Sequence, residues 1–183
     1  MDTRNIMRVI PTDTMPAIDA QLVGGGEWHL AEEHPERLSL VVFYRGLFCP
    51  VCRVWVADLD LLVPDFERRG VPVIALSCDP RERAEQAVEQ WGLKNLRVGY
   101  AVDSEDARKA GLYISEGRGV NPASNTEEPM LFSEPGVFAV QPDGTLYAAW
   151  VQSTPYARPQ FGEILAAVGT FVSSNLPDPR GAA

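Results

Sequence analysis

Two nearly continuous apolar segments with an amphipathic stretch between them restrict the fold of this chain more than any other feature of its sequence. Residues 38–44 read LSLVVFY and residues 71–77 read VPVIALS. Strands of a parallel sheet that are covered on both faces have this composition. In the stretch between them, apolar side chains recur at the spacing of one helical face: Val51, Trp55, Leu59, Leu62 and Phe66. The pattern predicts a strand, a helix from about Pro50 and a second strand, which together form an α/β unit.

The remainder of the chain continues this alternation. The sequence Asp79-Pro80-Arg81-Glu82 is typical of a helix start with Asp79 as the cap, while Pro64 is expected to kink the first helix and Gly70 to end it. Residues 113–134 are polar and contain several Gly and Pro residues, so we expect a long loop there. The other expected elements are strands at 18–23, 27–30, 97–102, 136–140 and 145–151, and helices at 104–112 and 159–172.

The length of 183 residues fits one compact domain. We expect its core to span about residues 15–172, with irregular ends at 1–14 and 175–183, and we find no internal repeat or second domain. Hydrophobic residues make up 45% of the chain and charged residues 22%, which excludes a disordered, collagen-like or coiled-coil protein. Helices that separate buried strands, followed by a hairpin near the end, predict an α/β sandwich with a mixed central sheet.

Charge and hydropathy restrict the class of partner. The 25 acidic residues outnumber the 16 basic ones and leave a net charge of −9, so the surface repels phosphate backbones and nucleic acid is not an expected partner. No apolar segment approaches the roughly 20 residues that cross a bilayer, and we expect no membrane partner. The first ten residues lack the apolar segment of a secretory signal, which favours a cytoplasmic location.

One group of residues carries chemistry: Cys49-Pro50-Val51-Cys52, placed where the first buried strand gives way to the first helix. Two cysteines three positions apart on a first helical turn face the same side and lie within reach of a disulfide. The unpaired backbone N–H groups and the helix dipole stabilise a thiolate at this position, and Arg45 and Arg53 add positive charge. The motif therefore predicts redox chemistry at Cys49 and Cys52.

Two other interpretations of the pair remain. Structural zinc sites use four ligands, and the chain has no second cysteine pair, while His29 and His34 lie outside any such pattern. We therefore expect no zinc at Cys49 and Cys52, and no bound cofactor. Both thiols could also be unreactive core residues, since free cysteine is often buried. Cys78, which follows the second buried strand, is interpreted as a small buried residue that is dispensable for catalysis.

Three segments of the chain together resemble the thioredoxin-fold superfamily: Phe43 to Cys52, Val71 to Pro80, and Glu134-Pro135-Gly136-Val137-Phe138-Ala139-Val140. Within it, the chain is most similar to the peroxiredoxin-like branch, the alkyl hydroperoxide reductase and thiol-specific antioxidant family. The resemblance covers roughly residues 15–172 and implies a three-layer sandwich of the peroxiredoxin type.

Two signatures of this superfamily fit the site in different ways. The peroxiredoxin signature Pro-x-x-x-Thr-x-x-Cys places its peroxide-reactive cysteine on Cys52, with Cys49 and Arg45 where that family has Thr and Pro. The Cys-x-x-Cys signature of thioredoxins and glutaredoxins instead makes Cys49 the exposed nucleophile and Cys52 its resolving partner. Thioredoxins also have a cis-proline ahead of a later strand, so the resemblance implies a cis Glu134–Pro135 bond that faces the sulfurs.

The resemblance implies a thiol-based antioxidant oxidoreductase that cycles Cys49 and Cys52 between dithiol and disulfide while it reduces hydroperoxides or protein disulfides. A thioredoxin- or glutathione-type thiol would supply the electrons, Arg45 and Pro135 would support the site, and the protein could form an oligomer. The alternative from a different class is a non-enzymatic module in which the same pair senses redox state or binds zinc. Which of the two sulfurs attacks peroxide stays open at this point, because the two signatures disagree.

Overall fold

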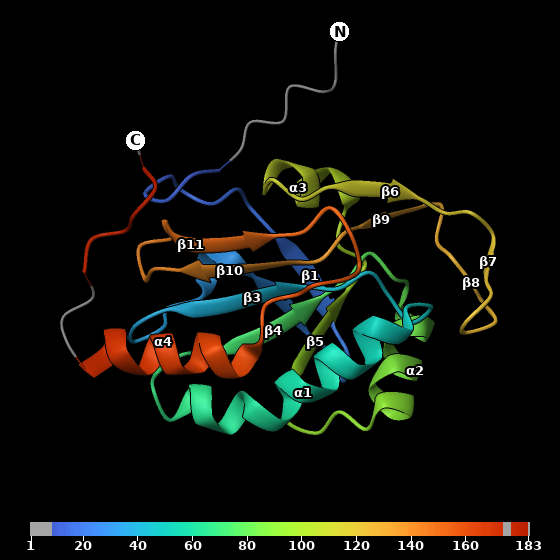
Figure 1. Cartoon of the computed structure of the whole chain (residues 1–183), viewed down its shortest axis with the longest axis horizontal. Helices are drawn as coiled ribbons and strands as arrows, with labels where there is room; N and C mark the ends of the chain where they lie inside the picture. Colours follow the sequence, from blue (N-terminus) through green and yellow to red (C-terminus); the bar gives the residue numbers. More distant parts are fainter. Residues whose placement is uncertain (1–8, 174–176, 183) are drawn as a thin grey trace, which may run out of the picture.

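The computed structural model describes residues 9–173 and 177–182, and the remaining parts of the two expected irregular ends lie outside these ranges. The described chain alternates strands and helices (Figure 1). The strands are β1 (Asp19–Leu22), β2 (Glu27–His29), β3 (Ser39–Phe43), β4 (Val73–Leu76), β5 (Arg97–Tyr100), β6 (Ile114–Glu116), β7 (Val120–Asn121), β8 (Thr126–Glu127), β9 (Leu131–Ser133), β10 (Gly136–Val140) and β11 (Leu146–Val151). The helices are α1 (Pro50–Glu67), α2 (Arg81–Trp91), α3 (Ser104–Lys109) and α4 (Phe161–Ser173), with a short 3-10 turn at Leu30–Glu32.

A seven-stranded mixed sheet forms the centre of the molecule, in the order β11-β10-β3-β4-β5-β1-β2. The three central strands β3, β4 and β5 are parallel, as the buried apolar segments predicted. Antiparallel strands extend the sheet on both sides, with β10 and β11 on one and β1 and β2 on the other. In the central register Val42 lies opposite Ala75 on one side and Val137 on the other.

Helices cover both faces of this sheet, which confirms the expected α/β sandwich. Figure 1 shows α1, α2 and α4 on one face and α3 on the other. Alternate residues of β3 enter two separate cores: Val42 packs among the residues of α1 and α4, and Val41 among residues that include Ala107 of α3. No helix of the described residues combines the length and apolar character that a membrane crossing requires.

The segment 113–134 is not the structureless loop that its Gly and Pro content predicted. It contains β6 paired with β9, and β7 paired with β8. Strands of two or three residues are too short to show the alternation by which a strand is recognised, so turn-forming residues dominate their sequence.

The start of α2 also differs from the prediction, because Asp79 does not cap it. The N-cap residue is Pro80, and no side chain accepts a hydrogen bond from the first turn. The Asp79 carboxylate is buried and accepts the backbone N–H of Leu47 at 2.7 Å instead. A buried N–H needs a hydrogen-bond partner. The Leu47 N–H finds this partner in the Asp79 carboxylate, which therefore points to the loop between β3 and α1 and not to the first turn of α2.

Candidate active site

The loop between β3 and α1 places both cysteines at the N-terminus of the helix, as the sequence predicted. Cys49 is the N-cap residue, with extended backbone angles, and Pro50 opens the helix. The Cys49 sulfur accepts the backbone N–H of Cys52 at 3.3 Å, and so occupies the position of a Ser or Asp oxygen in an ordinary N-cap. Both thiols are free and buried, with 1% of Cys49 and 0% of Cys52 exposed.

Arg158, in the loop between β11 and α4, contacts both sulfurs. Its Nη2 lies 3.3 Å from Sγ of Cys52 and 3.6 Å from Sγ of Cys49. The buried side chain is held by a hydrogen bond from Nε to the carbonyl of Pro155 at 2.8 Å, and its guanidinium lies 4.8 Å from the ring centroid of Trp55. Its Nη1 has no hydrogen-bond partner among the described residues. A fixed positive charge with an unused donor therefore lies beside the dithiol.

Arg45 is a second arginine at Cys49. Its Nη1 lies 3.9 Å from the Cys49 sulfur, and its backbone N–H lies 3.4 Å from the Cys52 sulfur. Its Nε lies 3.2 Å from Oε2 of Glu134, a buried carboxylate whose other oxygen accepts the Ser115 hydroxyl at 2.7 Å. The chain from β6 to β9 thus helps to hold the arginine that the sequence placed at this site.

Two aromatic rings fix the direction of the Arg45 side chain. The rings of Phe48 and Phe132 lie 5.1 and 4.8 Å from its guanidinium carbon, and they pack edge-to-face with each other, with centroids 4.9 Å apart. A guanidinium over aromatic faces gains electrostatic attraction. The Arg45 charge is therefore positioned from three sides: by a carboxylate, by two rings and by the Cys49 sulfur.

The surroundings of the two thiols shift their pKa values in opposite directions. The hydrogen bond from the Cys52 thiol, with further contributions from the Cys52 backbone N–H and the charges of Arg158 and Arg45, lowers the pKa of Cys49 to about 5, against the opposing effect of burial. Burial raises the pKa of Cys52, and the neighbouring Cys49 sulfur raises it further. Near neutral pH the pair therefore holds one thiolate, at Cys49, and one thiol, at Cys52.

Asp79 supports the loop that carries these residues. Its carboxylate accepts the Leu47 N–H and packs against Gly46, whose φ is +141°. A Cβ at Gly46 would lie 2.8 Å from both oxygens of Asp79, so a glycine is required for this close approach. Burial raises the pKa of Asp79 to about 6.

Three other expectations concern residues at or near the motif. The prediction of a cis Glu134–Pro135 bond is wrong, since no peptide bond among the described residues is cis. Only Glu134 and Pro135 separate β9 from β10, and the Pro135 carbonyl accepts the N–H of Gln152 at 2.9 Å. Arg53 is exposed on α1, and among the described residues its side chain contacts neither sulfur. Cys78 is half-buried, and burial raises its pKa.

Sequence reasoning missed Arg158 entirely and interpreted Trp55 as an ordinary core residue. More than one hundred positions separate Arg158 from the cysteines, and no local pattern marks a residue whose role depends on such a contact. Trp55 belongs to the apolar face of α1, as predicted, but it also supports the guanidinium of Arg158. Only the folding of the β11–α4 loop over the helix end brings the two together.

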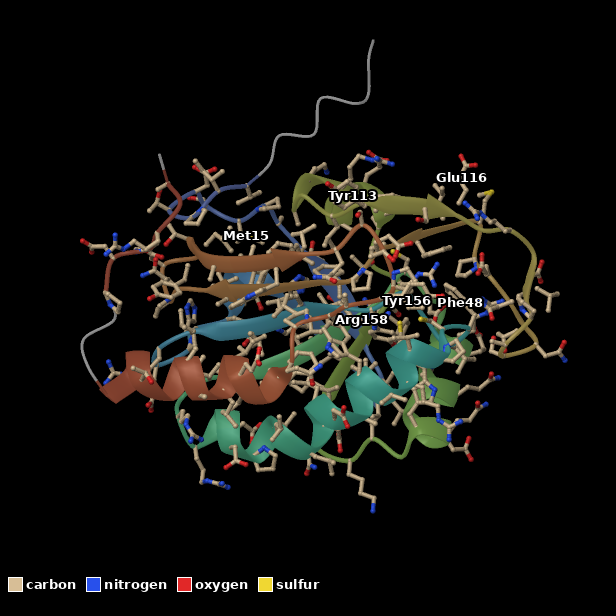
Figure 2. All side chains as sticks on the ribbon, in the orientation of Figure 1. Met15, Phe48, Tyr113, Glu116, Tyr156 and Arg158 are labelled. Atoms are coloured by element: carbon tan, nitrogen blue, oxygen red, sulfur yellow. The ribbon has the colours of Figure 1, made fainter. Side chains whose placement is uncertain are left out.

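A polar cleft opens beside this site. It has a volume of about 640 Å³ and is lined by Arg45, Phe132 and Glu134 together with exposed residues that include Tyr156. In Figure 2 the labelled Phe48, Tyr156 and Arg158 lie at the end of the sheet where α1 begins. No group of three or more His, Cys, Asp or Glu residues in the described ranges could hold a metal ion.

Comparisons with known proteins bear on the fold and on the family. The chain is similar to a 1-Cys peroxiredoxin of Dictyostelium discoideum, at 28% identity over 150 residues, and spans about half the length of that relative: 80% of this chain against 54% of the other. Two solved structures share the thioredoxin fold. A peroxiredoxin-like protein from Aquifex aeolicus matches at 16% identity with a TM-score of 0.70, covering 89% of this chain and 88% of that one. Peroxidoxin BcpB from Mycobacterium tuberculosis matches at 15% identity with a TM-score of 0.67, covering 89% and 98%.

A family model also matches the chain. It is that of the AhpC/TSA family, and it matches residues 11–149, which include the whole central sheet up to β11 and the Cys49–Cys52 motif. This match covers well over half of the chain. The protein therefore belongs to the AhpC/TSA family.

Proposed function

We propose that this protein is a thiol peroxidase that cycles Cys49 and Cys52 between dithiol and disulfide. Membership of the AhpC/TSA family indicates thiol peroxidase-type redox chemistry. The observation that carries the finer assignment is the pairing of a stabilised thiolate at Cys49 with the buried Arg158, whose Nη1 has no partner in the described part of the chain. The thiolate is the reactive form of cysteine, and the free donor would satisfy a peroxide oxygen.

In the oxidative step, the Cys49 thiolate attacks the nearer oxygen of a hydroperoxide. The S–O bond forms as the O–O bond breaks, so Cys49 becomes a sulfenic acid and the second oxygen leaves as an alkoxide or hydroxide that takes up a proton. The guanidinium groups of Arg158 and Arg45 lie beside the sulfur before reaction. Donors held in place in advance stabilise the charge that develops on the leaving oxygen.

In the resolving step, the sulfur of Cys52 attacks the sulfenic acid of Cys49. A disulfide forms and the hydroxyl group leaves as water, so the peroxide has taken two electrons from the dithiol. An external thiol reductant then supplies two electrons and two protons to restore the starting state. The bond requires only that the two sulfurs of one helical turn approach each other.

Mass spectrometry of the protein after one equivalent of hydrogen peroxide tests this sequence. We expect the native chain to lose two hydrogens as the disulfide forms. In Cys52→Ser a trappable sulfenic acid should accumulate on Cys49, and Cys49→Ser should form neither product. Cys78→Ser serves as the matched control and should behave as the native chain, because Cys78 is a free thiol that no disulfide joins to the pair in the described part of the chain.

Different results would contradict the assignment in distinct ways. A Cys49→Ser protein that forms a sulfenic acid on Cys52 would transfer the attacking role to Cys52, the position that the peroxiredoxin signature indicates. If Cys78→Ser abolished turnover and Cys49→Ser did not, the dithiol cycle would be wrong. Stoichiometric zinc in freshly purified protein, lost on substitution of either cysteine, would favour the zinc-binding alternative.

A further inference from the structure

An apolar pocket lies between helix α4 and the β10–β11 edge of the central sheet. Its volume is about 400 Å³, which falls within the range of roughly 300–1,000 Å³ that is typical of small-molecule sites. Apolar side chains of both elements form its walls: Tyr147, Ala148 and Trp150 from β11, and Ile164 and Val168 from α4. The described residues that line it include none of those at the dithiol, so the pocket is separate from that site.

Small side chains keep this space open. Ala139 of β10 and Ala148 of β11 lie directly opposite each other in the register of the two strands, and Ala167 of α4 also lines the pocket. Protein interiors are otherwise packed as densely as organic crystals, so larger residues at these positions would fill the volume. An apolar cavity of about 150 Å³ accepts benzene, and the present pocket therefore has room for a longer alkyl chain.

Both ends of the described chain lie at this pocket. Pro11 and Arg180 line it, and a Cβ at Gly181 would lie 3.7 Å from Cγ of Pro11. Figure 1 shows the C-terminal segment, in red, close to the blue N-terminal segment at the edge of the sheet. Strands, helix and both ends of the chain thus bound the pocket, which is more than an open face of one helix.

The charge at the pocket indicates the chemistry of its ligand. Arg180 alone is charged among the described residues that line it, and its exposed side chain makes no hydrogen bond or ion pair with any described residue. A guanidinium pairs with a carboxylate through two parallel N–H groups. The chain has a net charge of −9, but charges more than about 8 Å away are largely screened at physiological ionic strength. A ligand with one negative charge therefore suits this position, whereas the acidic surface opposes each further negative charge.

We propose that this pocket binds a single-chain fatty acid, with its alkyl chain between α4 and the β10–β11 edge and its carboxylate at Arg180. Burial of the alkyl chain against apolar walls supplies the affinity, and the guanidinium selects an acid over the corresponding alcohol. Binding at this site is independent of the proposed dithiol cycle, because it requires neither sulfur.

Tryptophan fluorescence tests whether the alkyl chain enters the pocket, because Trp150 lines it. Dodecanoate with a bromine at its methyl end quenches an indole that it contacts. We expect saturable quenching in the native protein, at concentrations below those at which micelles form. Trp150→Phe should remove most of this quenching although Trp28, Trp55 and Trp91 remain. Titration calorimetry with dodecanoate should give one site per chain.

Two pairs of variants test the wall and the charge separately. Ala167→Leu places a larger side chain in the pocket and should weaken dodecanoate binding about tenfold or more. Its matched control is Ala166→Leu, an exposed position of the same helix that does not line the pocket, which should bind as the native chain does. Arg180→Glu should weaken dodecanoate binding about tenfold and leave dodecanol binding unchanged. Arg118→Glu, at an exposed arginine outside the pocket, should leave both unchanged.

Several results would overturn the fatty-acid assignment. They are the absence of quenching, undiminished quenching in Trp150→Phe, equal affinity of the native protein for dodecanol and dodecanoate, and unchanged dodecanoate affinity in Ala167→Leu or Arg180→Glu. A native protein that sediments as a dimer and binds no dodecanoate would assign the pocket to a second copy of the chain. Arg180 lies outside the helices and strands, so its variant still decides the question if Ala167→Leu does not fold.

Discussion

The guanidinium of Arg158 contacts two sulfurs that titrate in opposite directions. Its Nη2 lies closer to Cys52 than to Cys49, yet the thiolate forms on Cys49, because the Cys52 thiol and backbone N–H both donate to that sulfur. Cys52 is more deeply buried and lacks the position at the helix cap. A shared arginine thus stabilises the pair as a unit, and local hydrogen bonding selects the sulfur that carries the charge.

Substitution of Arg158 should raise the pKa of Cys49. In Arg158→Met the buried positive charge is lost, and we expect the pKa of Cys49 to rise by about one unit or more. The rate of alkylation by iodoacetamide, followed from pH 4 to pH 9, measures the thiolate directly. The native midpoint should lie near pH 5, and Arg37→Met, which removes an exposed arginine elsewhere, should share that midpoint. An unshifted midpoint in Arg158→Met would show that its charge does not reach Cys49.

Asp79 should make the stability of the fold depend on pH in the opposite sense to an ordinary carboxylate. Burial raises its pKa from 3.8 to about 6, so the folded state holds a proton that the unfolded chain releases between these values. The stabilisation is complete below pH 4 and is lost as the pH rises through 6. Relative to Asp79→Asn, the native protein should gain about 2 kcal/mol in free energy of unfolding between pH 7 and pH 4, measured by urea titration.

At the scale of helices and strands, the sequence predicted what local composition controls. The apolar segments at 38–44 and 71–77 became β3 and β4, and the stripe between them became the buried face of α1 except for Val51, which is exposed. The same reasoning placed both cysteines at the N-terminus of this helix. Burial on both faces and helical spacing are properties of a single segment, so these elements needed no knowledge of the rest of the fold.

The features that the sequence did not reveal depend on contacts between distant segments. Asp79 fits the sequence pattern of a helix cap, but its carboxylate accepts the N–H of Leu47 instead of an N–H of the first turn of α2. The pairing of β6 with β9 crosses a segment full of turn residues. The cis form expected at Pro135 came from a resemblance rather than from its neighbours, and the bond is trans in the two-residue link between β9 and β10.

The carboxylate of Asp60 joins helix α1 to the loop between α2 and β5. Asp60 is buried, and its Oδ1 accepts the backbone N–H groups of Lys94, Asn95 and Leu96 at 2.8 to 2.9 Å. Asp60→Ala should lower the free energy of unfolding by about 3 kcal/mol, because three buried donors lose a charged acceptor. Urea denaturation measures the loss. Asp58→Ala, on an exposed position of the same helix, should stay within about 0.5 kcal/mol of the native value.

For the molecule as a whole, the stabilised thiolate couples stability to redox state. The pKa of Cys49 falls from 9.0 to about 5 on folding. The lowered pKa stabilises the folded state, and this stabilisation is complete above pH 9 and is lost as the pH falls through 5. The disulfide form has no thiol at this position and lacks the contribution, whereas Asp79 titrates in both forms and cancels in their difference.

The free energy of unfolding of the reduced protein, minus that of the oxidised protein, should therefore fall by about 3 kcal/mol between pH 8 and pH 5. Parallel urea titrations of the two forms at both pH values supply the four numbers. Cys49→Ser, compared with the reduced native protein, should show the same loss. A difference that does not vary with pH would mean that the folded chain holds no thiolate at Cys49.

The stacking of Arg158 on Trp55 has an optical consequence. The indole also donates to the Pro159 carbonyl at 3.0 Å and stacks on Phe161 with ring centroids 4.6 Å apart, so its surroundings are fixed apart from the charge state of the sulfurs that Arg158 contacts. Indole fluorescence responds to nearby charge, and the emission should change when the thiolate becomes a disulfide. Trp55→Phe should abolish this change although Trp28, Trp91 and Trp150 remain. The native protein would then report each half of its own turnover in a fluorimeter, with no added dye.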